Sequence, residues 1–115
     1  MAAAPLTIRE YLARGGQNPF RTWLSRLDLT VRARIQARVL RFESGNLGDH
    51  RAVGLGVWEA RCAFGPGYRI YFAKADAAVI LLLLGGSESS QRSDIRTAQR
   101  YWADYLEEHA RGTSK

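Results

Sequence analysis

The chain has 115 residues, of which 46% are hydrophobic, and this predicts one domain over residues 1–115 with enough apolar side chains for a core. A single cysteine excludes an internal disulfide. The single cysteine and the lack of a signal-peptide pattern at the N-terminus favour a cytoplasmic location. The longest apolar run, Ala77–Leu84, is too short to cross a membrane. The net charge of +6 favours nucleic acid or an acidic protein as the partner.

The N-terminal part of the chain predicts a short strand followed by a helical hairpin. The strand covers Leu6–Leu12 and ends before two consecutive glycines. Asn18 and Pro19 predict a helix start, because asparagine caps a helix and proline fits its first turn. That helix has an apolar stripe of Phe20, Trp23, Leu24 and Leu27. A second helix is expected to begin near Asp28–Thr30, with an apolar stripe of Val31, Ile35, Val39 and Phe42.

The rest of the chain predicts an antiparallel meander and a closing helix. After a loop at Gly45–Asp49, strands are expected near Ala52–Val53, Val57–Phe64, Tyr68–Ala73 and Ala77–Leu84. A polar turn at Gly85–Ser90 leads to a helix that should bury Ile95, Ala98, Trp102, Tyr105 and Leu106, and Arg111–Lys115 should be frayed. We therefore expect an α+β fold whose helices cover one side of the sheet and leave the other side in solvent.

Two of these strands place arginines on one face of a predicted hairpin. Alternation puts Trp58 and Ile70 on the apolar face, and the link Gly65–Gly67 supplies turn residues. The arginine fork fits phosphate, so this face is a candidate cradle for RNA, although an ordinary solvated face fits the same pattern. The polar face carries Glu59, Arg61, Arg69 and Tyr71.

Arginine dominates the basic residues of the N-terminal half. Nine arginines lie between Arg9 and Arg51, against four acidic residues. On the second predicted helix, Arg34, Arg38 and Arg41 form a basic ridge apart from the apolar stripe. This ridge is either a solvated helix face or a contact with ribosomal RNA, and binding of the second kind would depend strongly on salt.

Other constellations point to no metal and no cofactor. His50 and His109 are far apart and lack the cysteine or carboxylate spacing of a metal site. The serines at positions 87, 89 and 90 have no partnered histidine and are better suited to capping a helix.

An ordered set of motifs from about Leu6 to Leu106 resembles the RelE/ParE superfamily of bacterial toxins from type II toxin–antitoxin systems, closest to its HigB-like branch of addiction module killer proteins. The motifs are Gly45–Asp49, Trp58–Arg61, Phe64–Phe72, Leu82–Gly86, Ser90–Gln91, Asp94–Ile95 and Ala98–Tyr105.

The resemblance implies a ribosome-dependent ribonuclease that cleaves messenger RNA with the ribose 2′-hydroxyl as nucleophile and without a metal. It assigns Arg61 and Arg69 to phosphate binding and charge stabilisation, and makes Tyr71 and Glu59 candidates for orienting or relaying a proton. It also implies neutralisation by a cognate antitoxin, in the HigA style a helix-turn-helix protein. RNA contacts are expected from Arg34, Arg38, Arg41, Arg51 and Arg92.

Two residues depart from the family pattern, because lysines are usual where this chain has Glu59 and Glu88. Both changes remove positive charge from the expected site, and a carboxylate at Glu88 would repel RNA phosphate unless it pairs with an arginine or supports the start of the last helix. Arg92 is the residue placed to compensate. Two other activities therefore stay open: inhibition of DNA gyrase without RNA cleavage, and a degenerate module that only binds its antitoxin.

Overall fold

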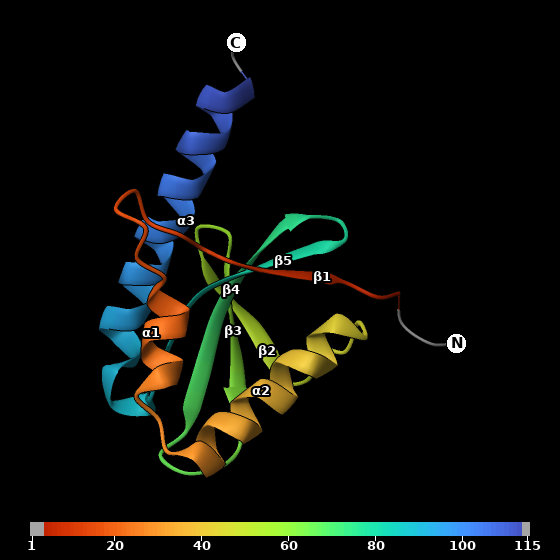
Figure 1. The fold of residues 1–115 in the computed structure, drawn as a ribbon, viewed down its shortest axis with the longest axis vertical. Coiled ribbons are helices and arrows are strands. Elements are labelled where there is room, and N and C mark those ends of the chain that lie inside the picture. Colours follow the sequence, from red (N-terminus) through yellow and green to blue (C-terminus); the bar gives the residue numbers. More distant parts are fainter. Residues whose placement is uncertain (1–3, 114–115) are drawn as a thin grey trace.

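The computed structural model describes residues 4–113, with side chains up to Arg111, as a mixed five-stranded sheet covered by three helices (Figure 1). The strands are β1 (Thr7–Glu10), β2 (His50–Gly54), β3 (Val57–Cys62), β4 (Tyr68–Asp76) and β5 (Val79–Gly86). The helices are α1 (Pro19–Ser25), α2 (Leu29–Glu43) and α3 (Gln91–Thr113), and a single 3₁₀ turn, Glu88–Ser90, precedes α3.

The strand order β1-β5-β4-β3-β2 confirms the predicted antiparallel meander from β2 to β5. The N-terminal strand completes the sheet by pairing parallel to β5, with Thr7 opposite Val79. The start of α1 is also as expected: Pro19 is its first residue, and the Asn18 side chain accepts a hydrogen bond of 3.0 Å from the Arg21 N–H. Asp28 precedes α2 without a side-chain cap.

The sheet has a hydrophobic core on each face, so the expectation of helices on one side is wrong. The first core, under α1 and α2, includes Phe20, Leu24, Ile35, Phe42, Ile70 and Phe72. The second lies under α3 and includes Tyr11, Val57, Tyr71, Leu81, Leu83 and Ala98. The physical reason is the apolar run of β5, which carries large side chains on both faces and needs cover on both.

The long helix α3 differs from its prediction towards its C-terminal end. It continues past the sheet (Figure 1), so Leu106, expected in the core, is 49% exposed. The helix also includes Arg111–Thr113, expected to be frayed, whereas Ser114, Lys115 and the first three residues lie outside the described part of the chain. No helix among the described residues is long and apolar enough to cross a membrane.

The turn between β2 and β3 contains a strained leucine. Leu55 has a φ of 54° between two glycines that also have positive φ, and its side chain is 78% exposed. The left-handed region is unfavourable for a residue with a Cβ atom, and asparagine tolerates it better. The exposed side chain has little packing to offset this strain.

We expect Leu55→Asn to raise the free energy of unfolding by about 0.5–1 kcal/mol, because it relieves backbone strain and removes an exposed apolar group. Urea denaturation measures the change. The matched control is Leu12→Asn, which changes a 60% exposed leucine without positive φ and should leave stability nearly unchanged. Equal effects of the two substitutions would contradict the strain argument.

Candidate functional site

Two adjoining hollows over the end of β3 form what we call the basic groove. Their volumes are about 390 and 480 Å³, and they share five lining residues between Asp49 and Phe64. One lies beside α2 and the other beside the turn between β3 and β4. The groove therefore joins the helix ridge and the hairpin arginines, which the sequence placed on separate elements. Its charged lining residues are Arg34, Arg38, Arg41, Arg61, Arg69, Asp49 and Glu88.

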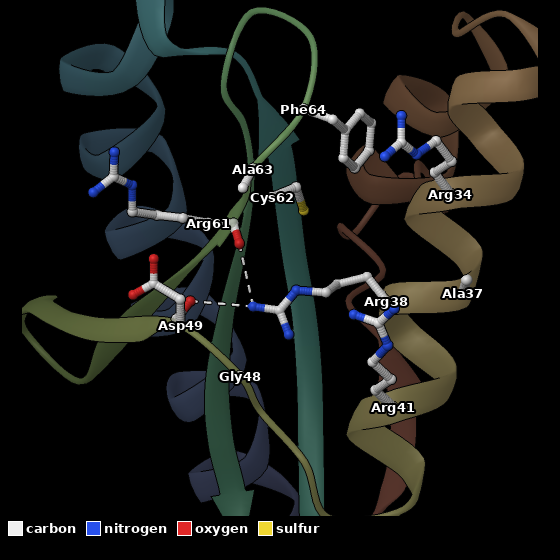
Figure 2. Close-up of a pocket in the computed structure, with 10 residues that line it drawn as sticks. All are labelled: Arg34, Ala37, Arg38, Arg41, Gly48, Asp49, Arg61, Cys62, Ala63 and Phe64. Carbon is white, nitrogen blue, oxygen red and sulfur yellow. Dashed lines mark hydrogen bonds between the residues drawn. The ribbon is translucent and has the colours of Figure 1, made fainter.

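Three of these arginines, Arg34, Arg41 and Arg61, have exposed side chains. Within residues 4–113, none of the three has a carboxylate within ion-pair distance. Arg34 and Arg41 reach out from α2, and Figure 2 shows Arg61 pointing away from that helix, on the other side of the β3 end. The Arg34 guanidinium lies over the Phe64 ring, 4.1 Å from its centroid. These side chains leave positive charge available to a ligand.

Arg38 is different, because it is only 7% exposed and its guanidinium is used within the fold. Nη1 donates to the Leu47 carbonyl at 2.8 Å, and Nη2 donates to the carbonyls of Asp49 at 3.1 Å and Arg61 at 3.2 Å (Figure 2). Gly48 gives it room, since a Cβ there would lie 2.3 Å from Nη1. The interpretation of the ridge as three solvated arginines is therefore wrong for Arg38, which fixes the groove floor.

Glu59 is completely buried beneath α3 and does not line the groove. Its Oε1 accepts a hydrogen bond from Arg51 Nε at 3.1 Å, and its Oε2 accepts one from Gln91 Nε2 at 2.9 Å and lies 3.4 Å from Arg69 Nε. Burial alone would raise the pKa of Glu59, but the hydrogen bonds from Gln91 and Arg51 outweigh it and lower the pKa below 4.5. Arg51 is thus tied to this carboxylate.

Tyr71 is also completely buried, as the floor of the second core. Its hydroxyl lies near the Glu59 carboxylate without a hydrogen bond of normal geometry. Burial, and then the negative charge of Glu59, raise the pKa of Tyr71 far above its usual value, so the phenol stays protonated. The expectation of Tyr71 and Glu59 on a solvent-facing surface is wrong, because α3 covers both side chains.

Arg69 lines the groove although its side chain is nearly buried, with 4% of the residue exposed. Nη1 donates to the Gly67 carbonyl at 2.9 Å, which aligns the guanidinium along the turn between β3 and β4. Glu88, which is exposed, lines the same hollow and donates its backbone N–H to the Pro66 carbonyl at 3.4 Å. Glu88 is thus placed beside Arg61 and Arg69, as the sequence predicted.

Arg92 lies outside the basic groove. It lines a neighbouring hollow of about 370 Å³ together with Arg96, and Glu88 is the charged residue common to the two hollows. The expected compensation of Glu88 by Arg92 inside the groove is therefore not seen.

The structure also adds two groove residues that sequence reasoning did not select. Asp49 ends the Gly45–Asp49 loop and Phe64 follows β3 by two residues, and neither position signals a site until the fold brings α2 beside them. Among the described residues, no three histidine, cysteine, aspartate or glutamate side chains gather as they would around a metal ion.

Removal of the Glu59 charge should destabilise the fold. We expect Glu59→Gln to lower the free energy of unfolding by ~3 kcal/mol, because it leaves Arg69 buried beside a neutral group. Chemical denaturation at neutral pH measures this. The control is Glu88→Gln, an exposed carboxylate with no ion pair among the described residues, which should have little effect. A loss for Glu59→Gln no larger than that of the control would contradict the structural role.

The same carboxylate predicts a pH dependence of stability. The folded state lowers the pKa of Glu59, so its contribution is complete above the unfolded value of 4.5 and is lost as the pH falls through the lower folded value. We expect stability to fall more steeply below pH 4.5 in the native chain than in Glu59→Gln. Denaturation midpoints over an acidic pH series measure the difference, and parallel curves would argue against it.

Comparison with known proteins finds a relative of this chain. No family model matches the chain, and no solved structure matches it significantly. An uncharacterized protein of Haemophilus influenzae is 41% identical to it over 81 residues, which cover 70% of this chain and 82% of the relative. Identity of this extent over most of both chains reflects common descent. The chain therefore belongs to the same family as this Haemophilus influenzae protein.

Proposed function

We propose that this protein is a toxin of a type II toxin–antitoxin system, related to the RelE/ParE superfamily, that binds RNA in the basic groove and cleaves messenger RNA on the ribosome. The observation that carries the proposal is the meeting of arginines from α2, β3 and β4 in one groove. Arg34, Arg41 and Arg61 reach this groove with exposed side chains and no carboxylate within ion-pair distance among the described residues. A polyanion with repeated phosphates suits such a groove.

Metal-independent cleavage by the ribose 2′-hydroxyl needs positive charge around the scissile phosphate. Arg61 is the residue best placed to supply it, since it is exposed and lies at the junction of the two hollows. Arg69 supports it from the groove wall, where its guanidinium is already oriented by Gly67. Donors held in position before the substrate binds stabilise developing charge without reorganisation.

The cleavage chemistry also needs a group that accepts a proton. Glu59 and Tyr71 are enclosed beneath α3, so neither serves a substrate in the groove. Among the described residues, the carboxylates that line the groove are Asp49 and Glu88. The proposed mechanism therefore rests mainly on charge stabilisation by Arg61 and Arg69.

The burial of Glu59 and Tyr71 also favours a second candidate, a toxin-like protein that binds RNA or an antitoxin without cleaving RNA. In both candidates the partner is a cognate antitoxin, proposed to be a helix-turn-helix protein. An acidic segment of such a partner would be attracted to the basic groove, and complementary charge speeds association. No residue of the groove specifically supports inhibition of DNA gyrase.

Arg61→Ala tests the ribonuclease function most directly. We expect it to reduce messenger RNA cleavage on translating ribosomes by about a hundredfold and to relieve growth inhibition, because one charge-stabilising donor is lost. Arg69→Ala is less informative, since Arg69 is buried beside Glu59 and its loss affects the fold. The matched control is Arg100→Ala on an exposed position of α3 outside the groove. Full cleavage by a folded Arg61→Ala protein would refute the proposed site.

The charge at Glu88 should limit activity. We expect Glu88→Lys to increase cleavage several-fold at low salt, because a lysine beside Arg61 attracts phosphate where the carboxylate repels it. The gain should shrink at higher salt, since exposed charges are screened. The control is Glu43→Lys, which changes the net charge equally at an exposed position that does not line the groove. Equal cleavage rates for native protein and Glu88→Lys would contradict this prediction and indicate that Glu88 acts only in supporting the start of α3.

A further inference from the structure

Arg34 differs from the other exposed arginines of the basic groove because its guanidinium contacts an aromatic ring. The Arg34 guanidinium carbon lies over the Phe64 ring, 4.1 Å from its centroid. Phe64 is itself held, half-buried, against Tyr68 with ring centroids 5.5 Å apart. Arg34 remains exposed, and Figure 2 shows its guanidinium against the ring where α2 faces the end of β3.

This geometry suits the face of a nucleobase. A guanidinium plane stacks on bases as it does on aromatic rings, and the cation–π contact with Phe64 holds the Arg34 guanidinium in the groove before a ligand arrives. Arg41, seven residues further along α2, lines the same hollow. Its guanidinium lies over no aromatic ring of the described residues, so it is placed to act as a point charge. Phe64 lines both hollows, so a strand that crosses the groove passes the Arg34–Phe64 pair.

We propose that Arg34, backed by Phe64, is a stacking platform for an unpaired base of the bound strand. The inference rests on the proposed RNA-binding function and deepens it by naming the residues that contact a base. A base enclosed in a duplex has its faces covered by its neighbours, whereas an unpaired base offers one to the platform. In this arrangement Arg34 stacks on a base, and Arg41 and Arg61 bind phosphate.

The test compares Arg34→Lys with the matched control Arg41→Lys. Both keep the charge on the same helix and in the same hollow, but lysine has no plane for stacking. Fluorescence anisotropy measures the affinity of each protein for three labelled probes of about 12 nucleotides, a length within the range that single-strand binding folds cover. The probes are oligoadenylate RNA, a base-free ribose-phosphate strand and oligodeoxyadenylate. Thermal melting confirms that both variants fold.

We expect Arg34→Lys to weaken binding of oligoadenylate by about fivefold or more and to leave the base-free strand nearly unaffected. Arg41→Lys, at a residue placed to bind phosphate, should affect the two probes equally. Equal weakening of both probes by Arg34→Lys, or no weakening of either, would overturn the platform. Failure of the native protein to bind any probe would instead overturn the proposed RNA-binding function. Tighter binding of oligodeoxyadenylate than of the RNA, with the same dependence on Arg34, would support the platform and count against RNA as its natural strand.

Discussion

The buried carboxylate of Glu59 is the constraint on which the arrangement of α3 over the sheet depends. Its partners come from three elements, since Arg51 belongs to β2, Arg69 to β4 and Gln91 to α3. A carboxylate removed from water is costly unless several donors face it, so these elements keep their positions together. The first turn of α3 is thereby fixed beside the turn between β3 and β4, and with it the wall of the groove that carries Glu88.

The arginines of the basic groove divide into two classes. Arg38 is bound to backbone carbonyls and Arg69 lies between Gly67 and Glu59, so both shape the groove from within the fold. Arg34, Arg41 and Arg61 extend into it without a carboxylate partner among the described residues. A high arginine content therefore serves two purposes, because the guanidinium can satisfy several acceptors inside a fold and also bind a polyanion outside it.

Sequence reasoning predicted the local structure well and the burial of charged residues poorly. The alternation of β3 and β4 is as expected, with Ile70 on one face and Tyr71 on the other. Periodicity shows which side of α3 is apolar, but it does not show which face of the sheet that side covers. The apolar residues on both faces of β5 were the pattern that could have predicted helices on both faces of the sheet. Burial of Glu59 and Arg38 depends on partners from distant elements, and a residue pattern does not contain them.

The parallel pairing of β1 with β5 has a consequence for the order in which the chain folds. Thr7 lies opposite Val79, so the first strand has no neighbour in the sheet until nearly the whole meander exists. Contacts between such distant parts of a chain form late and slow folding. During synthesis, α1 and α2 emerge long before β5, which contributes Ile80 and Leu82 to the core beneath them. The lining of the groove at the end of β3 is complete only when the chain has left the ribosome as far as Glu88.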